Sequence, residues 1–197
     1  MGYEPNGVPR NPAEQRLNVF ALVIYIPDPL GKFLDDLRRE LVPGCNPHAH
    51  VSVLPPRPLS GDWQAAREQV RSLAESWRPF DITLADIDVF PVTNVVYLEL
   101  GKGAAEMHAL HAAMNTDALR FDEPFEYHPH ITLAQEIPSD RVAAICGRAR
   151  AIWDGFTGPR TFRANRAAFV QNTLGNCWID LAEYTLGATG DVVAGRR

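Results

Sequence analysis

The stretches His48–Val53 (HAHVSV) and His128–Leu133 (HPHITL) decide the fold of this sequence, because they repeat one pattern. Each contains a histidine, any residue, a hydroxyl residue and an aliphatic residue, written His-x-[Ser/Thr]-h. Each also lies in a short run that is typical of a β-strand. Alternate side chains of a strand point to the same face. The first stretch therefore presents His50 and Ser52 on one face, and its valines point to the other face.

The second stretch presents His130 and Thr132 in the same way. Histidine can give or take a proton at neutral pH, and hydroxyl groups can hydrogen-bond the non-bridging oxygens of a phosphate. Two facing histidines can carry out a displacement at phosphorus, in which one deprotonates water and the other protonates the leaving oxygen. The pattern does not show which histidine is the base, because the two halves look alike.

The flanking sequence is duplicated as well. His50 and His130 are eighty residues apart, and Phe80 and Phe162 follow them by 30 and 32 residues. Two copies of such a unit normally pack about a pseudo-twofold axis. We therefore expect the two motif strands to meet near that axis, which would bring the two histidines together across a cleft.

The hydrophobic pattern predicts one domain over residues 16–186, with a loose arm at 1–15 and a mobile tail at 187–197. The first motif strand should stop at Pro55-Pro56, and Asp62 should cap a helix that runs to about residue 77. The other predicted strands are 19–26, 80–90, 95–100, 161–170, 177–183 and the second motif strand, and the other predicted helices are 28–41, 104–119 and 138–153.

Composition narrows the choice of function. A chain of 197 residues with 46% hydrophobic residues can bury one substantial core. A net charge of -5 argues against non-specific binding of long nucleic acid, which usually needs an excess of basic residues. Three cysteines without zinc spacing indicate reduced thiols in the cytoplasm. The apolar run Leu17–Ile26 is too short to span a membrane, so we expect no membrane partner. We also expect the protein to be a cytoplasmic monomer.

The paired motifs His50–Val53 and His130–Leu133, in a duplicated chain, resemble those of the 2H phosphoesterase superfamily. Its 2'-5' RNA ligase-like and cyclic phosphodiesterase branches are the most similar, and the resemblance covers residues 17–186. It implies an α+β, duplicated and bilobal fold. In this fold, two mainly antiparallel sheets with outer helices surround a central cleft.

The resemblance also implies an activity. It implies a phosphoesterase that opens a 2',3'-cyclic phosphate or a related cyclic phosphodiester without metal or cofactor, with 2'-5' RNA ligation as a further activity. His50 and His130 would then be the acid/base pair, and Ser52 and Thr132 would bind the phosphate. The substrate would be a small cyclic phosphate or an RNA terminus.

Other residues near the motifs are weaker candidates. Arg57 follows the first motif in a proline-rich loop and could reach a phosphate. Tyr127 precedes the second motif and could stack on a base. His48 and His128 share the face of the catalytic candidates, so they either touch substrate at the rim or are simply exposed.

Two other classes of function stay open. The same cleft could hold a nucleotide or RNA end without turnover. The two His-x-His pairs could instead bind zinc, copper or iron, since they aim imidazoles in one direction. The metal hypothesis leaves the hydroxyl residues unexplained, and we therefore predict no metal. His108 and His111, three apart on a predicted helix, are interpreted as a solvated face.

Overall fold

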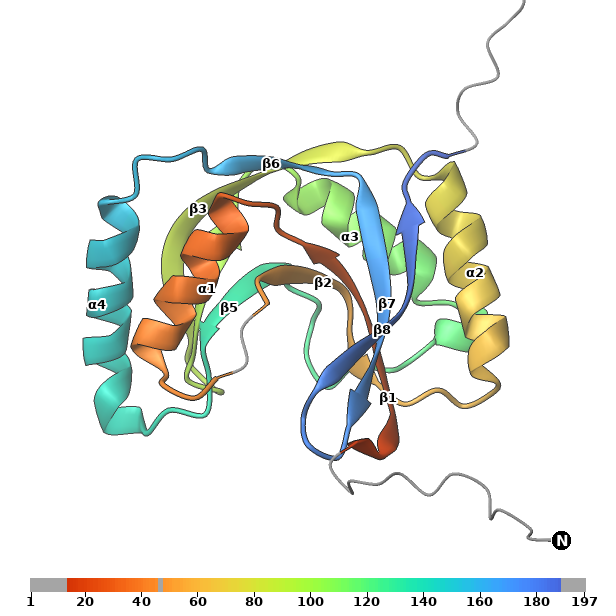
Figure 1. Cartoon of the computed structure of the whole chain (residues 1–197), viewed down its shortest axis with the longest axis horizontal. Helices are drawn as coiled ribbons and strands as arrows, with labels where there is room; N and C mark the ends of the chain where they lie inside the picture. The colour runs from red at the N-terminus through yellow and green to blue at the C-terminus, as the bar shows by residue number, and fades with distance from the viewer. Residues whose placement is uncertain (1–13, 46–47, 189–197) are drawn as a thin grey trace, which may run out of the picture.

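The computed structural model describes residues 14–45 and 48–188 and contains two four-stranded antiparallel sheets (Figure 1). The predicted arm and tail lie outside these residues, apart from residues 14–15 and 187–188. The first sheet has the order β2 (His50–Arg57), β1 (Arg16–Tyr25), β7 (Arg166–Thr173) and β8 (Trp178–Thr185). The second sheet has the order β5 (His130–Ala134), β4 (Val95–Leu100), β3 (Phe80–Phe90) and β6 (Thr161–Ala164).

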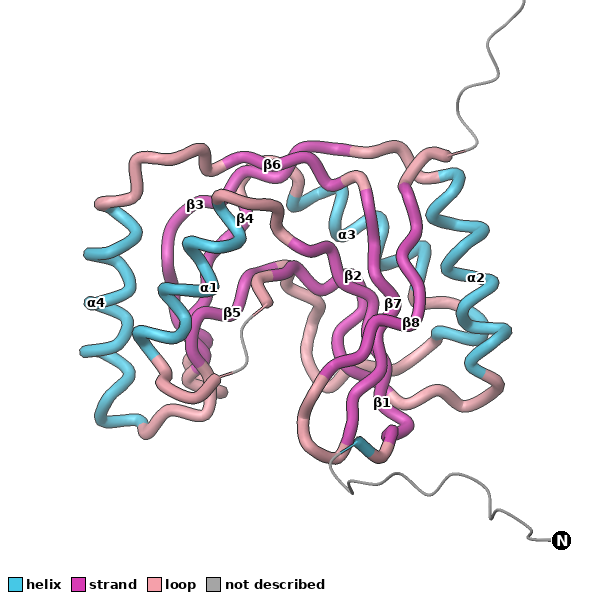
Figure 2. Tube along the Cα trace, viewed as in Figure 1, coloured by secondary structure: helices cyan, strands magenta, loops and turns pink. Residues whose placement is uncertain are grey.

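Two pairs of helices flank the sheets, and the strands occupy the middle of the molecule (Figure 2). The helices are α1 (Leu30–Leu41), α2 (Trp63–Ser76), α3 (Ala104–Met114) and α4 (Val142–Asp154). Helices α1 and α4 pack against the second sheet, and α2 and α3 pack against the first. The structure therefore has the α+β, bilobal architecture that was predicted.

The duplication is visible in the order of the strands. β2, β1 and β7 of the first sheet correspond to β5, β4 and β3 of the second. β3 comes from the first half of the chain but lies in the second sheet, whereas β7 comes from the second half and lies in the first sheet. Each sheet is thus built from both halves, and one hydrophobic core runs through both lobes.

Local sequence explains most of the element boundaries. The side chain of Asp62 accepts a hydrogen bond from the Gln64 backbone N–H at 3.3 Å, so the predicted helix cap is confirmed. Gly103 begins α3 with φ +92°, and a Cβ there would lie 2.6 Å from the carbonyl oxygen of Asp81. Only glycine fits this turn.

The first motif strand differs from the prediction, because β2 continues through Pro55 and Pro56 to Arg57. β2 is an edge strand that pairs with β1 alone within its sheet. Prolines are tolerated there because an edge strand has backbone positions that need no N–H donor.

The predicted strand 161–170 is in fact two strands, separated at Asn165. β6 pairs with β3 and β7 pairs with β1, so the chain crosses from one sheet to the other at this point. The predicted helix 104–119 ends at Met114, and a short 3-10 turn follows at Asp117–Leu119. Within the described part of the chain, no helix is long and apolar enough to cross a membrane.

Candidate active site

The two motif strands lie next to each other in the centre of the molecule (Figure 1). β2 begins at His50 and β5 begins at His130, and both are edge strands of their sheets. The side chains alternate as the sequence predicts. The buried positions are Val51, Val53, Ile131 and Leu133, and the partly exposed positions are His50, Ser52, His130 and Thr132.

The two imidazole rings are held by the same backbone contact. Nδ1 of His50 lies 2.7 Å from the carbonyl oxygen of His48, and Nδ1 of His130 lies 2.7 Å from the carbonyl oxygen of His128. A carbonyl oxygen can only accept, so Nδ1 carries the proton in both rings. Nε2 of each neutral ring therefore keeps a free lone pair.

The surroundings of His50 strongly favour its neutral form. Burial lowers the pKa of His50 to about 4, although the hydrogen bond to His48 acts in the opposite direction. Positive charge on Arg38, His48 or His130 lowers this pKa further. His50 and His130 are therefore close enough for the charge on one to affect the other.

His130 has a different charge beside it. Burial is again the main cause and lowers the pKa of His130, whereas the hydrogen bond to the His128 backbone raises it and positive charge on His128 lowers it. The carboxylate of Glu99 raises the pKa of His130, and Glu99 is also its cross-strand partner. The second half of the site thus offers a negative charge that stabilises a protonated imidazole.

Aromatic side chains support the second histidine. The ring of Phe90 stacks on Tyr97 with centroids 3.9 Å apart and meets the His130 ring edge-on at 5.0 Å. Glu99 Oε1 accepts from the Tyr97 hydroxyl at 3.2 Å and lies 3.0 Å from Nε2 of His128. The exposed His128 is therefore a hydrogen-bond partner of Glu99 beside the candidate acid/base pair.

In the first half of the site, Tyr25 occupies the cross-strand position that Glu99 occupies in the second half. Tyr25 is the cross-strand partner of His50, and its ring stacks on His48 at 3.7 Å. Its hydroxyl donates to Asp180 Oδ1 at 2.6 Å, and burial, followed by Asp180 itself, raises the pKa of Tyr25. The exposed His48 is thus packed on an aromatic ring.

Across residues 14–45 and 48–188, no group of three or more His, Cys, Asp and Glu side chains is placed to hold a metal.

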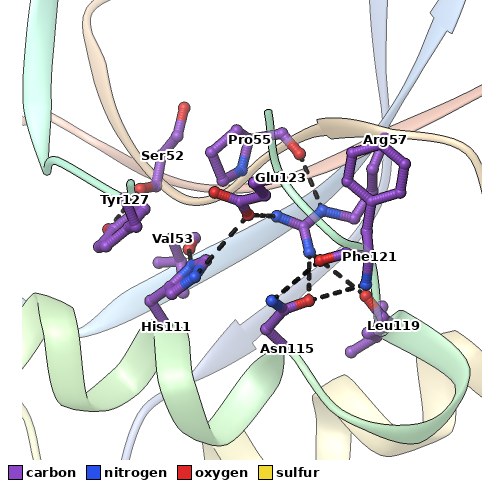
Figure 3. Close-up of polar contacts among 10 residues, drawn as sticks. All are labelled: Ser52, Val53, Pro55, Arg57, His111, Asn115, Leu119, Phe121, Glu123 and Tyr127. Carbon is purple, nitrogen blue, oxygen red and sulfur yellow. Dashed lines mark hydrogen bonds and ion pairs between the residues drawn. The ribbon is translucent and has the colours of Figure 1, made fainter. Parts of the chain in front are cut away.

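The two weaker candidates, Arg57 at the end of β2 and Tyr127 shortly before β5, make polar contacts within the protein (Figure 3). Arg57 is 2% exposed, and its guanidinium donates to Pro55 O, Asn115 Oδ1 and Glu123. The hydroxyl of Tyr127 donates to the carbonyl oxygen of Ser52 at 2.8 Å. The polar groups of both residues are therefore used inside the protein, and we do not count them as substrate contacts.

Sequence reasoning missed Arg38, a half-buried residue of α1 close to His50. Its Nε is buried, and no described residue accepts a hydrogen bond from it. Arg38 stands in a run of charged residues, so it resembles an ordinary solvated position. Its place between Leu34 and Leu41 on the apolar side of the helix is the one signal of its burial.

The family model of the 2'-5' RNA ligase superfamily matches residues 26–176. The chain belongs to this superfamily. A protein of Bacillus cytotoxicus, named provisionally as a phosphoesterase, is 29% identical over 110 residues, which are 51% of this chain and 63% of that protein. A protein of Oceanobacillus iheyensis, also named provisionally as a phosphoesterase, is 29% identical over 82 residues, which are 41% of this chain and 48% of that protein. The chain thus spans about half to two thirds of the length of these relatives.

Solved structures have the same fold. The protein TT0787 of Thermus thermophilus superimposes with a TM-score of 0.63 at 18% identity, covering 86% of this chain and 98% of that one. LigT of Escherichia coli in complex with 3'-AMP gives a TM-score of 0.59 at 17% identity, covering 88% and 98%. Both comparisons confirm the bilobal, two-sheet architecture.

Proposed function

We propose that the protein is a phosphoesterase that opens 2',3'-cyclic phosphates or related cyclic phosphodiesters by two-histidine acid/base catalysis without a metal. The observation that carries the proposal is the matched pair of imidazoles on adjacent edge strands, each with Nδ1 bound to a carbonyl oxygen and Nε2 free. Membership of the superfamily and the names of the relatives support it. LigT, which shares the fold, has been crystallised with 3'-AMP, NADP+ and ATP.

The different neighbours of the two histidines suggest their roles. His50, with a pKa of about 4, is neutral at pH 7 and accepts a proton from the attacking water. Burial lowers the pKa of His130 as well, but His130 is the acid, because the Glu99 carboxylate raises this pKa and the phosphate of a bound substrate would raise it further.

Each histidine moves one proton in a turnover. Nε2 of His50 takes a proton from water, and the water oxygen forms a bond to phosphorus. The bond from phosphorus to one ring oxygen breaks, and Nε2 of His130 gives that oxygen its proton. The products are a phosphomonoester and a free hydroxyl group. The Ser52 and Thr132 hydroxyls donate to the non-bridging oxygens as negative charge builds. Joining of RNA ends in a 2'-5' linkage would use the same residues, with the 5'-hydroxyl of a second RNA end in place of water: its oxygen forms the bond to phosphorus, and the bond from phosphorus to the 3'-oxygen breaks.

Turnover of 2',3'-cyclic AMP, and of a short RNA ending in a 2',3'-cyclic phosphate, tests the proposal in excess EDTA. Loss of either histidine, in His50→Ala or His130→Ala, should lower kcat by about 10²- to 10⁴-fold, because general acid and base catalysis contribute that much. His108→Ala is the matched control, since His108 is an exposed histidine on α3. Equal activity in all three variants, or activity that EDTA abolishes, would contradict the proposal. Tight binding of the cyclic nucleotide without turnover would favour a binding module.

A further inference from the structure

A partly buried network of polar contacts connects the first motif strand to the segment that leads into the second (Figure 3). We call it the Arg57 network. Its members are Ser52, Val53, Pro55, Arg57, His111, Asn115, Leu119, Phe121, Glu123 and Tyr127. We infer that this network positions the two halves of the active site relative to each other, with Tyr127 and Arg57 as positioning residues. The inference rests on the function proposed above.

The Arg57 guanidinium fixes the chain between α3 and β5. Its Nη1 donates to Asn115 Oδ1 at 2.7 Å and to the Leu119 carbonyl oxygen at 3.3 Å, and its Nη2 donates to Glu123. The Glu123 side chain is 13% exposed, so this ion pair is largely removed from water. A buried charge that loses its partner is strongly unfavourable, and Arg57 and Glu123 therefore hold each other in place.

Asn115 closes the same segment into a loop. Its Oδ1 also accepts from the Phe121 backbone N–H at 2.9 Å, and its Nδ2 donates to the Phe121 carbonyl oxygen at 3.1 Å. The segment thus has its own internal hydrogen bonds as well as those to Arg57. It runs directly into Tyr127 and the second motif, so the start of β5 is anchored to the end of β2.

Tyr127 makes the direct connection between the motifs. Its hydroxyl donates to the carbonyl oxygen of Ser52 at 2.8 Å, and burial raises the pKa of Tyr127, so the hydroxyl keeps the proton that it donates. Its ring lies parallel to His111, with centroids 3.8 Å apart, and Nδ1 of His111 donates to the Val53 carbonyl oxygen at 2.8 Å.

The sequence positions of these contacts explain why they affect catalysis. Tyr127 is three residues before His130, and the Ser52 carbonyl is two residues after His50. One hydrogen bond therefore joins the side chain of a residue just before one candidate catalytic histidine to the backbone just after the other. Small errors in the placement of reacting groups lower rates steeply, and about 1 Å can cost 10²-fold.

The variant Tyr127→Phe tests the inference, because it removes the hydroxyl and keeps the ring on His111. The matched control is Tyr184→Phe, since the Tyr184 hydroxyl also donates to a backbone carbonyl, that of Arg67 at 3.3 Å, but at an exposed position. With 2',3'-cyclic AMP, well below the unfolding temperature of each variant, we expect Tyr127→Phe to lower kcat about tenfold with little change in KM. Tyr184→Phe should match the wild type. Equal kcat values for the two variants would overturn the inference.

A second readout does not need turnover. The ring C–H signals of His50 and His130, followed by NMR as a function of pH, should both move in Tyr127→Phe and stay unchanged in Tyr184→Phe. If the wild type opens no cyclic phosphate, the proposed function fails, and these signals alone decide the inference. Unchanged signals for both histidines in Tyr127→Phe would then overturn it.

Discussion

The two halves of the candidate site share a framework and differ in charge. His50 and His130 each begin an edge strand and use Nδ1 in the same way. The first half adds the Arg38 cation near its histidine, whereas the second half adds the Glu99 carboxylate. The duplicated chain thus carries two imidazoles in the same setting, and the charges around them differ, which is the basis for proposing one as base and the other as acid.

The largest expected effect concerns the leaving group. An aryl phosphodiester releases a phenolate that needs no proton, so the acid becomes dispensable while the base does not. On a cyclic nucleotide, we expect His130→Ala to be about 10³-fold less active than the wild type. On a 4-nitrophenyl phosphodiester, we expect the same variant to keep most of the wild-type activity. His50→Ala should be impaired on both substrates. The release of nitrophenolate measures turnover directly. If His50→Ala, and not His130→Ala, keeps its activity on the aryl substrate, His50 is the acid and His130 is the base.

The pH dependence of kcat/KM is the next test. His50 must be unprotonated and has a pKa of about 4, so activity should rise through that region. His130 must be protonated, and its pKa lies below the usual 6.5, so activity should fall before neutrality, about tenfold for each further pH unit. We expect a bell-shaped profile with an acidic optimum, measured with the free enzyme at low substrate concentration. An optimum above pH 7 would contradict the lowered pKa values of His50 and His130 on which this prediction rests.

A smaller effect should follow from removing the negative charge of Glu99 in the second half of the site. Glu99→Gln removes the negative charge that raises the pKa of His130, so the protonated fraction at a given pH decreases. The alkaline limb of the pH profile, where kcat/KM falls as His130 loses its proton, should move to lower pH. At pH 7, kcat/KM should fall about threefold to tenfold. The acid limb should stay in place. Asp180→Asn is the control in the first half, because Asp180 contacts Tyr25 and not His130.

The smallest expected effect comes from Arg38. Arg38→Met removes a positive charge that lowers the pKa of His50, so this pKa should rise, by less than the change that burial causes. The acid limb should move to higher pH, with a loss of less than about twofold at pH 5. Arg38→Lys keeps the charge and should leave the limb in place. NMR titration of His50 in both variants measures the shift, and an unchanged pKa in Arg38→Met would contradict the proposed charge effect.

The main features of the site follow from local sequence. The alternation around His50 and His130 predicts their common face, and the eighty-residue repeat predicts a paired arrangement. Periodicity also predicts most elements, including the strands Phe80–Phe90 and Val95–Leu100. These features depend on residues that are close in sequence or on a pattern that occurs twice.

Contacts between distant segments could not be predicted. Arg57 looks like a free cation in a proline-rich loop, but its partner Glu123 is 66 residues away. The crossing at Asn165 depends on which strands already occupy each sheet, and nothing in Thr161–Val170 shows this. Arg38 becomes informative only when α1 is packed against the rest of the protein.

The exchange of β3 and β7 between the sheets has a consequence for the origin of the molecule. A half-length chain carrying one motif lacks the strand that its own sheet needs, so it could complete that sheet only by taking the strand from a second copy. Two such copies would form a strand-exchanged homodimer with twofold symmetry and identical histidines. Fusion of the two copies into one chain would free each half to vary separately, and this is the condition under which one histidine can acquire a cation and the other a carboxylate.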